Sequence, residues 1–293
     1  MKCRIHDVVR RHLRIPVLLS AAALGLGPAV GAQGARETVD GISWVYETDG
    51  GTAVLSASTV PRTTEGRVVV PEKLGGVRVA GIGDYAFHDC SRMTEVVLPA
   101  GIERIGEHAF QDCTALVRAE LPESLVHIGY YAFAGCISLE SAELPRKLRE
   151  LGNCVFHGCT ALRSVGWSPA LETVGASAFS HCVALGEVRL PPRVVRVGDF
   201  AFAACTLLRG VALPDAVKSI GEAAFCDCPS LETLALPAGV REVGLDAFAR
   251  SGLRRLVLRG GKGAVIPRGA VPEGCEWVDG EGKALEPYGG GAP

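Results

Sequence analysis

The feature that most constrains the fold is a motif that returns every 23 residues. The pattern IGxxAFxxC occurs twice within Ile105–Cys136, and its glycine, phenylalanine and cysteine keep their spacing along the chain. Self-similarity at a period of about 20 to 50 residues is typical of stacked repeats, so we predict a solenoid in which equal positions form columns. The phenylalanine column comprises Phe87, Phe110, Phe133, Phe156, Phe179, Phe202, Phe225 and Phe248. The cysteine column comprises Cys90, Cys113, Cys136, Cys159, Cys182, Cys205 and Cys228, and Ser251 replaces cysteine in the eighth copy.

Each repeat divides into three parts. Segments such as MTEVVLP (93–99) alternate apolar and polar residues and end at proline, which predicts a short strand. A second extended piece, such as GIERIG (101–106), ends at a glycine that can turn the chain at little steric cost. The AFxxC part is predicted to be a compact turn, one turn of 3₁₀ or α-helix.

The complete motif, LxxVxLPxxLxxIGxxAFxxC, resembles the BspA-like leucine-rich repeats of bacterial surface proteins and of some parasitic protists. The resemblance extends from about Val79 to Leu258. It implies a β-rich, right-handed leucine-rich-repeat solenoid with short parallel strands, 3₁₀ or short helical turns, eight 23-residue coils and a β-rich N-terminal cap. It also implies adhesin-like binding, without catalysis, of a protein such as a host matrix or envelope protein, or of another macromolecule.

The chain is expected to have four parts. Residues 1–32 combine basic residues with the apolar run IPVLLSAAALGLGPAV and small residues before a cleavage point near Ala32, which predicts a secretory signal peptide. An uncleaved membrane anchor is the alternative, although the apolar run is shorter than the ~20 residues that span a bilayer. A β-rich cap is predicted for 33–78, the solenoid for 79–258, and a C-terminal cap with a flexible tail for 259–293. The mature protein is therefore expected to be secreted, or located at the cell surface or in the periplasm.

Composition and charge limit the classes of partner. Hydrophobic residues make up 48% of the chain and charged residues 21%, which excludes a disordered polymer. Loss of residues 1–32 would remove five basic residues and one acidic residue, leaving 25 Lys+Arg against 31 Asp+Glu. Because binding to phosphate needs clustered positive charge, we expect no nucleic-acid partner and no membrane insertion after signal cleavage.

The cysteines allow two interpretations. Thiolates bind zinc and paired thiols oxidise in secreted proteins, so a metal or redox protein is one hypothesis. However, one cysteine per coil makes a line, whereas zinc takes four ligands in a tetrahedron, so the spacing favours a packing role and no cofactor. CVFHGC (154–159) and CDC (226–228) are weaker ligand candidates, and Cys226 and Cys275 are a candidate disulfide that would hold the C-terminal cap.

No set of nucleophile, base and acid is discernible, so we expect a protein that is not an enzyme. The five histidines that follow the signal peptide occupy turn or exposed positions and are expected to be solvated.

Variable residues that point outward from the strands form the candidate partner-binding face. In the fourth repeat a tryptophan occupies a leucine position, which predicts a shifted strand exit and a local bend or widened groove. The alternative is a structural envelope component that assembles with itself, and the oligomeric state stays open. The candidate residues are Glu95, Arg118, Glu120, Glu140, Glu143, Arg163, Trp167, Glu187, Arg189, Arg209, Arg254 and Arg255.

Overall fold

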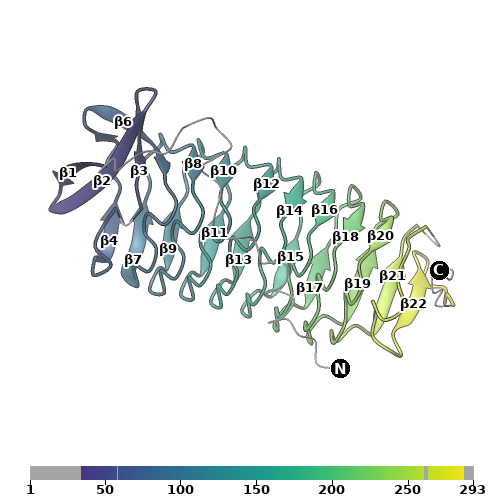
Figure 1. The fold of residues 1–293 in the computed structure, drawn as a ribbon. Helices are drawn as coiled ribbons and strands as arrows, with labels where there is room; N and C mark the ends of the chain where they lie inside the picture. The colour runs from purple at the N-terminus through teal and green to yellow at the C-terminus, as the bar shows by residue number, and fades with distance from the viewer. Residues whose placement is uncertain (1–33, 58, 261–262, 287–293) are drawn as a thin grey trace. The chain divides into compact units, whose positions relative to one another are not determined.

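The computed structural model describes residues 34–57, 59–260 and 263–286. The chain divides into two compact units, Met1–Gly34 and Ala35–Pro293, and almost all described residues belong to the second. That unit is a β-solenoid in which successive coils lie side by side in chain order (Figure 1). The predicted signal peptide lies outside the described residues.

Two ladders of short parallel strands run along the solenoid. We number the coils 1 to 8 by their phenylalanines, from Phe87 to Phe248. The first ladder consists of β4 (Glu65–Val69), β7 (Arg92–Val97), β9 (Arg118–Glu120), β11 (Ser141–Glu143), β13 (Ser164–Gly166), β15 (Glu187–Arg189), β17 (Gly210–Ala212), β19 (Thr233–Leu236), β21 (Arg255–Leu258) and β22 (Glu276–Asp279). The second ladder consists of β6 (Val77–Ile82), β8 (Arg104–Ile105), β10 (His127–Ile128), β12 (Glu150–Leu151), β14 (Thr173–Val174), β16 (Arg196–Val197), β18 (Ser219–Ile220) and β20 (Glu242–Val243).

The register of both ladders keeps equal repeat positions adjacent. Glu95 pairs with Arg118 in the first ladder, and Ile82 pairs with Ile105 in the second. Since side chains alternate across a strand, the apolar members of each ladder point into one continuous core. The eight phenylalanines stack inside it, with neighbouring ring centroids 4.9 to 5.7 Å apart and planes within 16° of parallel.

The AFxxC segments are hydrogen-bonded turns and not the helical turns predicted from sequence; the described residues contain no α- or 3₁₀-helix. The reason is a left-handed residue, with φ between +49° and +73°, both two positions before and two positions after each phenylalanine. A left-handed residue interrupts a right-handed helix. Only Gly135 and Gly158 among the sixteen are glycine, so the sequence carries little signal for this geometry.

The N-terminal segment covers the first coil with strands. β1 (Ala35–Val39), β2 (Ile42–Asp49) and β3 (Thr52–Leu55) are antiparallel, and β3 then pairs in parallel with β6, which also pairs with the short β5 (Lys73–Leu74). From β2, the buried Trp44 meets Phe87 edge-on at 6.2 Å. An aromatic ring therefore closes the N-terminal end of the phenylalanine stack.

At the other end, the ladders continue past residue 258. β22 pairs in parallel with β21, Val265 bridges to Glu242, and the Phe248 amide donates to the Ala270 carbonyl oxygen at 2.8 Å. Val271 follows Ala270 as phenylalanine follows alanine in most of the coils. The segment predicted to be a C-terminal cap thus contains a further coil, which lacks the phenylalanine that identifies the others.

The three sides of the solenoid are hydrogen-bonded to different extents. On the turn side, each phenylalanine amide donates to the next coil at 2.7 to 2.9 Å, without interruption. The second ladder is continuous from β12 to β20. The first ladder is interrupted at three seams, between β9 and β11, β13 and β15, and β17 and β19. The second ladder is itself interrupted between β10 and β12, in the same two coils as the seam after β9. The turns therefore hold the coils together at all three seams, and the second ladder does so as well at the seams after β13 and β17.

Candidate functional site

The outward side of the first ladder, which we call the interaction face, carries the residues predicted for partner binding. Glu95 and Trp167 are half-buried. The remaining candidates are exposed, and the strand residues between them, such as Ala142 and Val188, are buried. The exposed members are Arg118, Glu120, Glu140, Glu143, Arg163, Glu187, Arg189, Arg209, Arg254 and Arg255.

Charges at the two ends of this face are paired. Arg67 and Glu95 form an ion pair at 3.5 Å beside the N-terminal cap, and Arg255 and Glu276 form one at 3.0 Å beside the last strand. Between these ends, the charged side chains that point outward from the first ladder on coils 2 to 6 form no ion pair with any residue that the structure describes. The pair of Arg149 and Glu172, at 3.9 Å, lies beside the second ladder. The middle of the face therefore presents fully solvated charges.

One glycine shapes the centre of the face. Glu143 and Gly166 are direct neighbours in the ladder, and the Glu143 carboxylate lies over the Gly166 backbone. A methyl group added at Gly166 would collide with that carboxylate, because the two would occupy the same space. Glycine therefore allows Glu143 to lie flat across coil 4 toward the position of Arg189 on coil 5.

Trp167 follows β13 at the position where other coils place a buried leucine. Its ring meets Phe179 edge-on, with centroids 5.3 Å apart and planes at 67°. The phenylalanine stack is most tilted here, by 15° and 16° on the two sides of Phe156. Trp167 packs mainly against the core and adds only part of its surface to the face, and the bend or widened groove expected from its position stays a prediction.

The cysteine column lies in the core. From coil 2 to coil 7, each thiol donates to the phenylalanine carbonyl oxygen of the preceding coil at 3.1 to 3.2 Å. Burial raises the pKa of Cys90 to about 11 and that of Cys228 to about 12, and it raises the pKa of the cysteines between them. Protonated, buried thiols are poor nucleophiles and poor metal ligands, so the column links neighbouring coils by packing and hydrogen bonding.

The two weaker cysteine motifs do not form ligand clusters. In the described part of the chain, no group of three or more His, Cys, Asp or Glu side chains is arranged to hold a metal ion. Arg250 donates to Cys226 at 3.0 Å and pairs with Asp227, whose pKa it lowers. Cys275 has a free thiol, so the disulfide proposed between Cys226 and Cys275 is not formed.

Two histidines differ from the solvated side chains that the sequence suggested. His108 stacks between Tyr85 and Tyr131, with centroids 4.7 and 4.9 Å apart and planes within 5° of parallel. His157 is largely enclosed; burial, with a contribution from His181, lowers its pKa to about 4. The spacing of 23 between Tyr85, His108 and Tyr131 was the available signal for their stacking.

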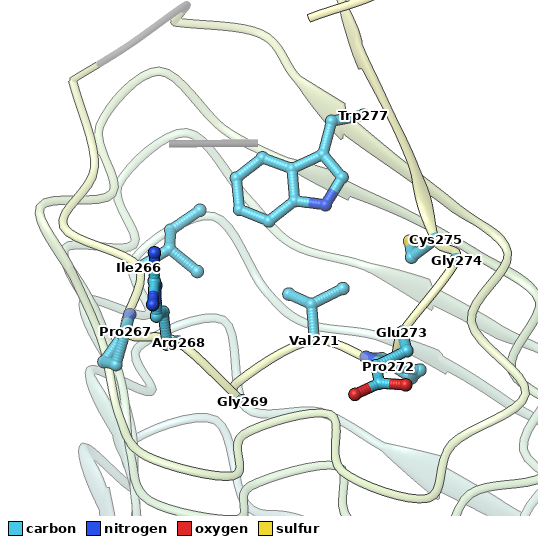
Figure 2. Close-up of a pocket in the computed structure, with 10 residues that line it drawn as sticks. All are labelled: Ile266, Pro267, Arg268, Gly269, Val271, Pro272, Glu273, Gly274, Cys275 and Trp277. Atoms are coloured by element: carbon cyan, nitrogen blue, oxygen red, sulfur yellow. The ribbon is translucent and has the colours of Figure 1, made fainter. Parts of the chain in front are cut away.

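A hollow of about 260 Å³ lies in the last coil (Figure 2). The Trp277 indole faces Val271 across it, and Arg268 and Glu273 lie on opposite sides of Val271. None of the residues of the interaction face lines this hollow. The hollow is therefore separate from the face predicted to bind a partner.

The described part of the chain contains no candidate for a membrane-spanning helix.

A family model described as the BspA-type leucine-rich repeat region, with six copies, matches residues 80–209 and 162–263. The chain is similar to the leucine-rich repeat protein of T. pallidum, at 28% identity and a TM-score of 0.51, with 71% of this chain and 86% of that one covered. It is also similar to a leucine-rich repeat protein of Bacteroides ovatus, at 24% identity and a TM-score of 0.57, with 83% and 70% covered. No curated protein matches the chain.

Proposed function

The chain belongs to the BspA-type leucine-rich repeat family, and from this premise we propose that it is a secreted or surface-exposed bacterial protein that binds a protein partner in an adhesin-like role without catalysis. Solenoids of this kind commonly bind partners through variable residues on an invariant frame. The observation that carries the proposal is the contrast along the interaction face, where the ends pair their charges and coils 2 to 6 leave theirs solvated.

Unpaired charges suit recognition because they can meet opposite charges on a partner at little cost to the fold. Surface ion pairs contribute only about 0 to 1 kcal/mol, so folding does not require these side chains to stay charged. Charge complementarity instead raises association rates and selects among partners. Variation between coils at these positions, on a core that hardly varies, is consistent with that use.

The test is a pull-down with the mature protein against matrix proteins and bacterial envelope extracts. The variant Glu140→Lys/Glu143→Lys/Arg189→Glu/Arg209→Glu reverses charge on the face and keeps the net charge unchanged. Capture of a protein that the wild type holds and this variant loses supports the proposal.

The matched control, Glu150→Lys/Arg196→Glu, reverses two exposed charges on the second ladder and should leave capture unchanged. Equal capture by wild type and face variant would exclude the proposed surface. Concentration-dependent growth in light scattering, with no captured protein, would instead indicate self-assembly.

A further inference from the structure

The charges on the interaction face are segregated along the solenoid. Three carboxylates lie together on coils 2 and 3, in Glu120, Glu140 and Glu143. Three arginines, Arg163, Arg189 and Arg209, lie on coils 4 to 6. Arg118 on coil 2 and Glu187 on coil 5 occupy the middle outward position of their coils. Each reduces the charge of its end of the face without reversing it. The face therefore has an acidic end and a basic end.

Small residues occupy many of the outward positions between the two ends, beside the exposed Arg163 of coil 4. The outward positions on coils 3 to 6 include serine, glycine and alanine, and Gly166 has no side chain beneath the Glu143 carboxylate. A partner backbone can approach these positions closely, as it cannot approach a sheet covered by long side chains. The small positions are Ser141, Ser164, Gly166, Gly186, Gly210 and Ala212.

The dimensions of the face limit its occupant. Coils 2 to 6 span four steps of about 5 Å, or about 20 Å, and a three-residue strand is about 10 Å wide. The resulting area of about 200 Å² is far below the ~800 Å² per partner of a stable interface between folded proteins. A second copy of the chain would therefore need surface beyond these coils to form a stable dimer, whereas an extended segment can be held by these coils alone. An extended segment advances about 3.4 Å per residue, so about six residues cover the face along its length.

We infer that the interaction face recognises an extended peptide segment of about six residues whose basic end lies over coils 2 and 3 and whose acidic end lies over coils 5 and 6. This inference rests on the proposed function and deepens it, because it specifies the chemistry of the partner. The order of charges along the segment determines its recognition. Its middle residues lie on the small side chains between the two ends of the face.

The test uses two peptides of equal composition, Lys-Lys-Gly-Ser-Glu-Glu and Lys-Glu-Gly-Ser-Lys-Glu, each anchored at high density on a biosensor surface. The mature wild-type protein should bind the segregated peptide at least tenfold more tightly than the mixed one, and salt should weaken the binding because these charges are exposed. Equal binding of the two peptides would overturn the inference.

The variant Glu120→Lys/Glu140→Lys/Glu143→Lys makes the acidic end of the face basic. It should lose at least tenfold in affinity for the segregated peptide and gain affinity for Glu-Glu-Gly-Ser-Glu-Glu, a gain that a misfolded protein would not show. Glu150→Lys is the matched control and should behave as wild type. If the pull-down partner is lost on charge reversal while the two peptides of equal composition bind alike, the inference fails and the proposed function stands. If no extract yields a partner, the proposed function fails whatever the peptides do.

Discussion

Replacement of Phe156 by alanine is expected to divide the solenoid into two units that unfold separately. Phe156 is buried between Phe133 and Phe179, with ring centroids 5.6 and 5.5 Å away. Truncation of a buried aromatic residue typically costs about 3 to 5 kcal/mol. Because each coil contacts only its neighbours, this loss falls on the two interfaces of coil 4 and weakens the coupling across it.

A phenylalanine at the end of the stack provides an internal comparison with Phe156. Phe248 ends the stack and has one stacked neighbour, Phe225 at 5.7 Å. An aromatic contact is worth about 0.5 to 1.5 kcal/mol beyond area burial, so Phe248→Ala should cost less than Phe156→Ala by about that amount. It should also fray the C-terminal end and leave the rest cooperative. Phe156→Leu, which retains apolar volume without the ring, should lie between wild type and Phe156→Ala.

Tryptophan fluorescence can follow the two halves separately. Trp44 and Trp277 lie near opposite ends of the chain, and Trp167 is the only other tryptophan. In single-tryptophan variants that retain Trp44 or Trp277, urea unfolding should give one shared midpoint for the otherwise wild-type chain and two distinct midpoints with Phe156→Ala. Coincident midpoints after Phe156→Ala would refute the nearest-neighbour reasoning.

Three further predictions concern pH, thiols and amide exchange. Since burial lowers the pKa of His157 from 6.5 to about 4, the unfolded chain takes up this proton first as pH falls. Stability should therefore decrease between pH 6.5 and 4, by at most about 3 kcal/mol, and in urea titrations His157→Gln should show a shallower decrease. The column thiols should resist a thiol reagent in the native protein and react fully in guanidinium; rapid native labelling would contradict their burial. The amides of Leu144 and Leu190 donate across intact parts of the first ladder at 2.7 and 3.1 Å, whereas those of Leu121 and Leu213 lie at seams and have no backbone acceptor among the described residues. In hydrogen exchange, the first two amides should therefore be better protected than the second two. Equal protection would mean that the seams are closed in solution.

Some site features were accessible from sequence because they depend only on the register. The outward positions of the first ladder follow from strand alternation, and Glu140, Arg189 and Arg209 are exposed as that alternation requires. The ion pairs of Arg67 and Arg255 were not predictable, because they depend on side-chain geometry at the ends of the ladder. The stacking of Tyr85, His108 and Tyr131 could have been found from their spacing, but the enclosure of His157 could not.

The sequence by itself determined the repeating unit, the family resemblance and the columns, because a period of 23 residues places the eight column phenylalanines and the seven column cysteines at the same point of each coil. Only the tertiary structure decided three other features. The left-handed residues around each phenylalanine are held by hydrogen bonds between coils and show no consistent residue preference. The coil after Leu258 forms by strand pairing although it lacks the motif. The Glu143 carboxylate lies over Gly166 because the two residues, 23 apart in the chain, become direct neighbours when the coils stack.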